Sequence, residues 1–430
     1  MSLKNKKFYP WLVVALLWVV ALLNYMDRQM LSTMQHKMAV DISELQSAEN
    51  FGVLMAAFLW IYGLVSPWAG FVADRLNRKW IIVFSLFVWS LVTLMMGLTH
   101  DFNTLYALRM IMGVSEAMYI PAALALIADY HTGGSRSLAI GVHMTGLYVG
   151  QALGGYGAVL SSMFTWQNTF FYFGLIGAVY AVILAFLLHE TDEHIARSKQ
   201  PAAGGGSKGL DFGSFGRIFR TPEFWVILIF FTMSSVPGWA TKNWLPTLFA
   251  TNLGISMEAA GPLSVITIAA SSFAGVFIGG YVSDRWVKAN VRGRVFTSAM
   301  GFTIMIPSLL LLAYSHTLFF VVLGGVLFGL GLGLFDTNNM PIVCQFFAPR
   351  YRSTAYGLMN MSGVLAGAGI TQLLGKLKDS MGDRFSESFV YMAVGLAVVV
   401  LIQLAFLRPK TDNMTEDSLD KTTNQSKYKG

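Results

Sequence analysis

Three ionisable side chains lie inside the most hydrophobic parts of this sequence. Asp27 and Arg28 are adjacent within an apolar run over residues 11–33, and Glu116 lies in a later apolar run. A charged side chain at bilayer depth costs a few kcal/mol or more, so such groups face a partner helix or a water-filled cavity. Arg28 presents a planar fork of donors that suits a carboxylate or a phosphate. Asp27 and Glu116 are acids that can carry a proton.

The same residues also fit a purely structural role. A buried ion pair among Asp27, Arg28 and Glu116 would lock two helices together without binding any substrate. Arg109 lies seven residues before Glu116, which places both on one face of a helix, two turns apart. Arg109 therefore either tunes a proton carrier at Glu116 or only stabilises the fold.

Polar residues in the second half of the chain are candidates for contacts with a sugar. Asn338 and Asn339 lie in one apolar run and Asn360 in the next. Amide side chains offer donors and acceptors to hydroxyl groups, and they also hydrogen-bond one helix to another. We expect the three asparagines to contact substrate, with helix packing as the alternative. Lys242 is either a second contact for an anion or a side chain that reaches the outer interface.

The elements that must hold these residues are membrane-spanning helices. Of the 430 residues, 55% are hydrophobic and only 12% are charged, which excludes an ordinary soluble domain. The net charge of +7 comes from basic residues placed between apolar runs, so we expect no nucleic-acid partner. Gly146, Gly150 and Gly154 recur every four residues, which predicts close helix packing. Twelve apolar runs are present, at about 11–33, 50–73, 80–98, 103–129, 137–161, 167–189, 222–250, 259–283, 294–315, 317–347, 353–378 and 386–407.

Lysine and arginine are concentrated in alternate connections between these runs. Such a bias marks the cytoplasmic side of a membrane protein. It predicts that both termini are cytoplasmic, and we expect the chain to lie in a bacterial cytoplasmic (inner) membrane.

A polar stretch divides the twelve runs six and six. It contains Pro201 and a glycine-rich segment at 204–207, which are typical of a flexible linker. The predicted fold is all-α and integral to the membrane, with twelve helices in two pseudo-symmetric six-helix bundles. The predicted parts are an N-terminal bundle over 1–189, a linker over 190–221, a C-terminal bundle over 222–408 and a polar cytoplasmic tail over 409–430.

A motif after the second apolar run returns after the eighth. Gly70-Phe-Val-Ala-Asp74-Arg75 is repeated as Gly280-Tyr-Val-Ser-Asp284-Arg285. The first copy resembles the G-x-x-x-D-R-x-G-R-[RK] signature of the major facilitator superfamily, with Asn77 replacing the second glycine. Asn tolerates the left-handed backbone conformation that a glycine would supply. The resemblance implies a conformational latch formed by Gly70, Asp74, Arg75, Arg78, Lys79, Asp284 and Arg285.

A narrower resemblance is to the anion:cation symporter branch, which includes hexuronate, galactonate and glucarate transporters. It rests on Asn24-Tyr25-x-Asp27-Arg28, Tyr62, Glu116-Ala117 and Trp244-Leu245-Pro246. This resemblance implies that Tyr25, Tyr62 and Arg28 hold the substrate carboxylate, and that Asp27 and Glu116 couple transport to protons. Spinster-like lipid transporters share the Asn-Tyr-x-Asp-Arg segment and a Glu-Ala-x-Tyr segment, which matches residues 116–119 here, and are the main alternative.

Two apparent enzyme motifs fail on spacing. His189 and His194 are five residues apart around Glu190 and Glu193, whereas a zinc protease helix needs four. The glycine-rich run at 204–208 lacks the spacing of a phosphate-binding loop. We therefore predict no enzyme, metal or cofactor, and a proton gradient as the coupling source.

The sequence predicts a monomeric secondary transporter that imports a small organic anion, such as a hexuronate or sugar acid, with a proton. The alternatives are a Spinster-like lipid transporter, a transporter of neutral sugars or sugar phosphates, and a sensor that binds a ligand without moving it.

Overall fold

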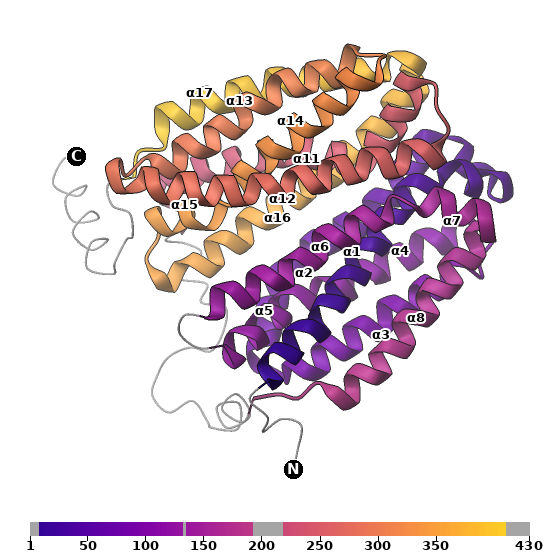
Figure 1. Ribbon diagram of the computed structural model, residues 1–430, viewed down its shortest axis with the longest axis horizontal. Coiled ribbons are helices and arrows are strands. Elements are labelled where there is room, and N and C mark those ends of the chain that lie inside the picture. The colour runs from indigo at the N-terminus through magenta and orange to yellow at the C-terminus, as the bar shows by residue number, and fades with distance from the viewer. Residues whose placement is uncertain (1–7, 132–134, 192–217, 410–430) are drawn as a thin grey trace. The chain divides into compact units, whose positions relative to one another are not determined.

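The computed structural model describes residues 8–131, 135–191 and 218–409 (Figure 1). These residues form helices joined by short connections, and none of them lies in a β-strand. Most of the predicted linker and all but the first residue of the predicted tail lie outside the described residues.

Each of the twelve predicted runs coincides with one helix or with a pair of consecutive helices, which confirms the all-α membrane fold. The helices of the first half are α1 (Tyr9–Asp41), α2 (Ala48–Arg75), α3 (Arg78–Met96), α4 (Phe102–Ala117), α5 (Tyr119–Tyr130), α6 (Arg136–Gly154), α7 (Gly157–Phe164) and α8 (Trp166–Leu187). Those of the second half are α11 (Pro222–Leu253), α12 (Met257–Ala289), α13 (Gly293–Tyr314), α14 (Leu318–Asp336), α15 (Asn339–Phe346), α16 (Pro349–Met381) and α17 (Ser388–Phe406).

Ten helical segments in the described part are long and apolar enough to cross a bilayer. Two predicted runs are not among these ten segments. They are the run that forms α6 and α7 and the run that lies in α16. α16 starts with Arg350 and Arg352 and ends with Lys376, Lys378 and Asp379, so its charged ends lower its average hydropathy.

Proline breaks two of the long runs at a defined place. α4 ends at Ala117. In an unbroken helix the carbonyl of Ala117 would accept a hydrogen bond from the N–H of residue 121, but Pro121 has no N–H. α14 ends at Asp336, and Pro341 likewise leaves the carbonyl of Thr337 without its helical donor. These breaks place Glu116 and Asn338 beside interrupted helical backbone.

Small residues bring α6 against α1. The glycine spacing predicted close packing of this helix but not its partner. A Cβ at Gly146 would lie 2.7 Å from the carbonyl oxygen of Trp18, and one at Gly154 would lie 2.7 Å from that of Met26. Gly150 meets the backbone of Leu22 in the same way. α6 therefore packs along the part of α1 that carries Asp27 and Arg28.

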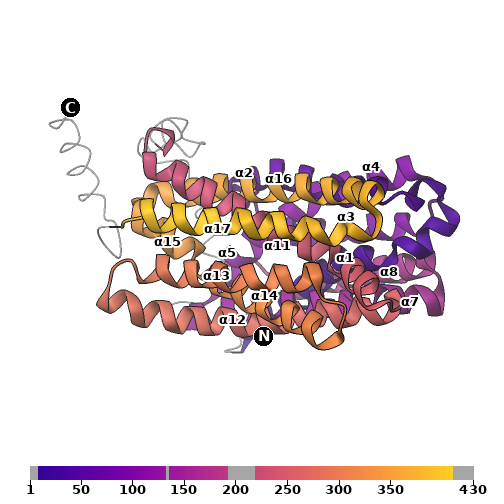
Figure 2. The ribbon, with the colours of Figure 1, turned by 90° about the horizontal axis from the view of Figure 1, so that it is seen from above.

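The chain divides into two compact units. The first comprises Met1–Lys208, Trp239–Ala269 and Gly367–Phe385, and the second comprises Gly209–Gly238, Ala270–Ala366 and Ser386–Gly430. In the second unit α13 runs alongside both α14 and α17 (Figure 1, Figure 2). There, a Cβ at Gly301 of α13 would lie 2.5 Å from the carbonyl oxygen of Gly331 in α14.

Within the first unit, the end of α16 packs on the start of α2. The carboxylate of Asp379 accepts hydrogen bonds from the Ser47 hydroxyl at 2.6 Å, from the Ala48 N–H at 2.9 Å and from the Glu49 N–H at 2.8 Å. A Cβ at Gly52 would lie 2.9 Å from the carbonyl oxygen of Thr371. A carboxylate at a helix N-terminus satisfies unpaired N–H groups and favours the helix dipole.

Candidate substrate and proton site

Arg28 forms a buried ion pair between α1 and α4. Its Nε lies 2.5 Å from Oε2 of Glu116, and only 12% of the Arg28 side chain and none of the Glu116 side chain is exposed. Breaking such a pair by removing one partner leaves an uncompensated buried charge, at a cost of about 3–5 kcal/mol. The predicted contact between the first and fourth spans is therefore present, and it joins Glu116 to Arg28.

Aromatic rings enclose the Arg28 guanidinium. Its central carbon lies 5.0 Å from the ring centre of Tyr25, 4.7 Å from that of Phe58 and 4.7 Å from that of Tyr62. Desolvated cation–π contacts of this kind stabilise a guanidinium and restrict where it can point. The structure thus gathers the predicted Tyr25, Arg28 and Tyr62.

Phe58 was not predicted, although it lies one helical turn before Tyr62 on α2. The two rings stack at 5.5 Å, and the guanidinium of Arg109 also lies over Phe58, at 4.9 Å. Residues four apart on a helix share a face, so the spacing from Tyr62 was the available signal. Phe58 connects the two buried arginines.

Asp27 faces a different helix from Arg28. Its Oδ2 accepts a hydrogen bond from the Thr93 hydroxyl of α3 at 2.5 Å, and the residue is 4% exposed. Consecutive residues on a helix point about 100° apart, because 3.6 residues complete a turn. The two adjacent ionisable groups therefore serve separate contacts, and Thr93 could not be identified without knowing which helix packs beside α1.

Several donors and acceptors of this cluster remain unsatisfied among the described residues. They are Nη2 of Arg28, Nε of Arg109, Oδ1 of Asp27 and Oε1 of Glu116, all buried. Arg109, which is 3% exposed, places Nη1 3.2 Å from the Met112 sulfur, a weak acceptor. Buried polar groups without partners are costly, so this cluster is suited to bind further polar groups.

The predicted asparagines of the second half lie at and near the break between α14 and α15. Asn338 is fully buried and its amide donates to the Leu334 carbonyl at 2.9 Å. The Asn339 amide lies 3.4 Å from Oδ1 of Asp336. The amide oxygens of both asparagines have no hydrogen-bond partner in the part of the chain that the structure describes. Asn360 is half-buried on α16, and all these residues belong to the second unit.

Lys242 belongs to the first unit and is half-buried on α11. Its ammonium lies 5.0 Å from the ring centre of Trp239, and its backbone carbonyl accepts a hydrogen bond from Gln29 at 3.0 Å. Gln29 follows Arg28 on α1, so this part of α11 packs beside the candidate site.

Among the predicted latch residues, Arg78 makes the clearest contacts. Its Nε donates to the Ala73 carbonyl at 3.3 Å, and its Nη1 lies 2.5 Å from Oδ2 of Asp129. Lys79 lies over the ring of Trp80 at 4.9 Å, and a Cβ at Gly70 would meet no atom within 4 Å. The side chains of Asp74 and Arg75 lie outside the described residues.

Asn77 does not adopt the left-handed conformation that an asparagine tolerates. Asn77 has a φ of −64° and a ψ of 112°, and its side-chain oxygen accepts the N–H of Trp80 as the N-cap of α3. Asn suits this position because a short side-chain acceptor satisfies an unpaired N–H of the first helical turn.

Glu190 also caps α3, and sequence analysis missed this role. Its carboxylate accepts the N–H of Arg78 at 2.6 Å and lies 3.4 Å from the N–H of Lys79. The side chain comes from the segment after α8, more than a hundred residues away, so no local pattern identified the contact.

The second copy of the motif makes polar contacts at the exposed end of α12. In the second unit Asp284 pairs with Arg294 at 3.2 Å, with 69% of the Asp284 side chain exposed, and Arg285 donates to the hydroxyl of Tyr281 at 3.0 Å. Exposed pairs of this kind contribute about 0–1 kcal/mol.

Comparison with known proteins gives one family and a consistent set of relatives. The family model described as Major Facilitator Superfamily matches residues 17–371 and 272–426. A probable L-galactonate transporter of Escherichia coli strain K12 is 26% identical over 312 residues, covering 68% of this chain and 67% of the relative. A probable galactarate/D-glucarate transporter of Bacillus subtilis strain 168 is 25% identical over 443 residues, covering 94% of this chain and 93% of the relative.

Solved structures of transporters share the fold. A bacterial homolog of the human lysosomal transporter Spinster, in an inward-facing and unoccupied conformation, has a TM-score of 0.76 and 20% identity, covering 96% of this chain and 100% of that chain. The nucleoside transporter NupG has a TM-score of 0.72 and 15% identity, covering 93% of this chain and 100% of that chain. At these identities the likeness shows the fold alone.

Proposed function

Because this chain belongs to the major facilitator superfamily, and is therefore a membrane transporter rather than an enzyme, we propose that it imports a small sugar acid together with a proton. The named relatives support an acidic cargo, since they are described as transporters of L-galactonate and of galactarate or D-glucarate. We propose that both termini lie in the cytoplasm, following the distribution of basic residues. We also propose a bacterial inner membrane, since the two relatives named above are bacterial.

The observation that carries the proposal is the hydrogen bonding of the Arg28 guanidinium. Its guanidinium is held by Glu116 and three aromatic rings, yet Nη2 has no hydrogen-bond partner among the described residues. A carboxylate of the substrate can accept from this nitrogen and so satisfy a buried donor. Tyr25 and Tyr62 then border the bound acid, as the family resemblance implies.

The charges of the cluster provide a route to proton coupling. Arg28 and Arg109 carry two positive charges, and Asp27 and Glu116 can carry two negative ones. Protonation of either acid leaves one positive charge in excess, which favours binding of an anion. Release of that proton restores the balance and favours release of the anion. Alternating access of the two halves around the site would convert this exchange into transport.

We also propose the asparagines of the second half as contacts for sugar hydroxyl groups, as the sequence predicts. The amide oxygens at positions 338 and 339, which have no hydrogen-bond partner among the described residues, can accept hydrogen bonds from such hydroxyls. We assign the same role to Asn360 from its polar character and half-buried position on α16.

Uptake into proteoliposomes tests the proposal. Labelled galactarate, galactonate, a hexuronate and a neutral hexose would be offered with and without an inward proton gradient to the wild type, Arg28→Ala and Arg28→Lys. The expected result for the wild type is gradient-driven uptake of the acids only. Arg28→Ala should reduce this uptake at least about a hundredfold, because it removes one partner of a buried ion pair. Arg28→Lys should restore little, because an ammonium cannot replace the planar fork.

Arg220→Ala serves as the control, because Arg220 is exposed before α11. It should leave uptake unchanged. Uptake of the neutral hexose, or of acids in the absence of Arg28, would make the ion pair structural and contradict the proposal. Transport of labelled phospholipid instead of sugar acids would support the Spinster-like alternative.

A further inference from the structure

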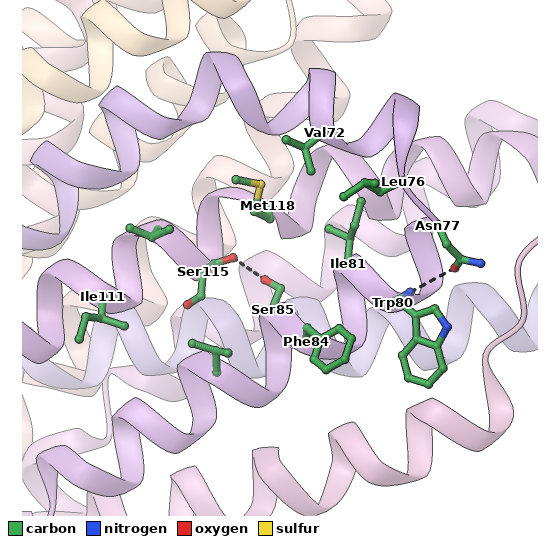
Figure 3. Close-up of a pocket in the computed structure, with 12 residues that line it drawn as sticks. Val72, Leu76, Asn77, Trp80, Ile81, Phe84, Ser85, Ile111, Ser115 and Met118 are labelled. Atoms are coloured by element: carbon green, nitrogen blue, oxygen red, sulfur yellow. Dashed lines mark hydrogen bonds between the residues drawn. The ribbon is translucent and has the colours of Figure 1, made fainter. Parts of the chain in front are cut away.

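An apolar groove lies on the first unit where the end of α2, α3 and α4 meet (Figure 3). It has a volume of about 860 Å³ and runs along α3 from Trp80 to Val88, with Ile111 and Val114 of α4 on its other side. Phe84 in this groove is 60% exposed and Ile111 is 49% exposed. In a chain that spans a membrane, such apolar surface faces the acyl chains of the bilayer.

The polar groups in the groove are occupied by the protein itself. The hydroxyl of Ser85 donates to the carbonyl of Ser115, and the side-chain oxygen of Asn77 accepts the N–H of Trp80 at 3.3 Å (Figure 3). The Ser115 hydroxyl donates to the Met112 carbonyl at 3.0 Å. These bonds leave apolar walls for an occupant, so a hydrocarbon chain suits the groove better than a sugar does.

The length of the groove matches one leaflet. Trp80 and Val88 are eight residues apart on α3, which corresponds to about 12 Å along the helix axis. One half of a hydrocarbon core is about 15 Å thick. Under the predicted orientation, Asn77 lies at the cytoplasmic surface and the groove extends from there toward the bilayer midplane.

A lysine and a tryptophan lie at the end of the groove that is nearest the cytoplasmic surface. The ammonium of Lys79 lies 4.9 Å from the ring centre of Trp80, which is 44% exposed. Trp is enriched where a membrane meets water, and a lysine there attracts the phosphate of an anionic lipid. The neighbouring Arg78 is buried and paired with Asp129. Of these two neighbouring cations with described side chains, Lys79 is therefore the one placed to meet a headgroup.

We propose that this groove binds one anionic phospholipid of the cytoplasmic leaflet, with an acyl chain between α3 and α4 and the phosphate at Lys79. The lipid is a bound partner of the transporter and not its cargo, so this inference does not rest on the proposed sugar-acid transport.

Photo-crosslinking measures occupancy of the groove directly. The full-length protein would be placed in vesicles of phosphatidylcholine that contain a small fraction of phosphatidylglycerol or phosphatidylcholine with a photoactivatable acyl chain. Peptide mass spectrometry then locates the adducts. The expected result is labelling concentrated at residues 72–88 and 111–118, about fivefold stronger for phosphatidylglycerol, which corresponds to roughly 1 kcal/mol for one lysine.

Two variants separate the chain from the headgroup. Lys79→Gln should abolish the preference for phosphatidylglycerol while labelling of the groove continues. Val88→Trp should reduce groove labelling severalfold by filling it. Val179→Trp is the matched control, because Val179 is 52% exposed on α8, outside the groove.

Equal labelling of the groove and the α8 face would show ordinary boundary lipid and overturn the proposal. So would an equal yield from the two headgroups, or a preference that persists in Lys79→Gln.

Discussion

At the scale of single residues, one carboxylate holds the central guanidinium. Glu116 pairs with Arg28, whereas Asp27 turns away to Thr93 on α3. The two acids therefore cannot be equivalent in a transport cycle. In the proposed cycle Glu116 would compete directly with a substrate carboxylate for Arg28, whereas Asp27 would influence the site through the net charge of the cluster.

Replacing Glu116 tests this difference. In Glu116→Gln the ion pair is lost and Arg28 keeps its full charge, so substrate exchange between two equal pools should continue. Accumulation driven by a proton gradient should fall about tenfold or more, because the acid that exchanges a proton against the substrate is missing. Counterflow and gradient-driven uptake in the same proteoliposomes check both parts. Loss of both activities together would contradict the assigned role.

Glu223→Gln is a suitable control for that variant. Glu223 lies in the first turn of α11 and is exposed, so both activities should remain at the wild-type level.

Much of the site could be predicted from residue types in an apolar setting. Buried charge is costly, and this alone singled out Arg28 and Glu116. Phe58 and Thr93 were not predicted, because apolar and hydroxyl residues are ordinary on a membrane helix. Only the packing shows which of them contacts a charged side chain. The N-cap role of Asn77 was not predicted, because an asparagine suits both a left-handed turn and a helix N-cap.

At the scale of helices, α6 packs directly against α1 and so fixes the position of the α1 segment that belongs to the candidate site. The close approach of Gly150 to Leu22 leaves no room for a side chain. The twelve runs and the close packing of α6 could be predicted from hydropathy and spacing, but α1 as the partner of α6 could not. The breaks after Ala117 and Asp336 were not predicted, because a proline in a membrane helix either bends it or ends it according to the neighbouring helices.

Enlarging Gly150 should displace α1 from α6. Gly150→Val is expected to lower uptake at least about tenfold and to reduce the stability of the purified protein, since overpacking costs about 1–3 kcal/mol. Thermal unfolding in detergent and uptake in proteoliposomes measure the two effects. Gly141→Val, where a Cβ meets no atom within 4 Å, is the matched control on the same helix. Equal behaviour of both variants would show that the α1–α6 contact does not position the site.

At the scale of the whole molecule, the first compact unit includes chain segments from both halves of the sequence. The end of α16 is held against the start of α2 by Asp379, through a hydroxyl and two backbone N–H groups. Sequence analysis predicted two bundles and a linker, and it gave no sign of this contact because the partners are more than 300 residues apart.

Removing that carboxylate should loosen the start of α2. Asp379→Ala is expected to speed hydrogen exchange at the amides of Ala48 and Glu49 about tenfold, because charge-assisted bonds to a helix N-terminus contribute about 1–2 kcal/mol. Glu44→Ala is the control, since Glu44 is exposed and contacts only the Ser43 hydroxyl through its side chain among the described bonds. Unchanged exchange at these two amides would show that the contact contributes little.

The central claim is that a sugar acid and a proton cross the membrane together, and proton movement driven by substrate tests it most directly. Proteoliposomes would contain a pH-sensitive dye, with no initial pH gradient and with the membrane potential clamped. Adding galactarate or galactonate outside should acidify the interior, while a neutral hexose and the Arg28→Ala protein should give no change. Uptake of labelled sugar acid without any change of internal pH would contradict the account.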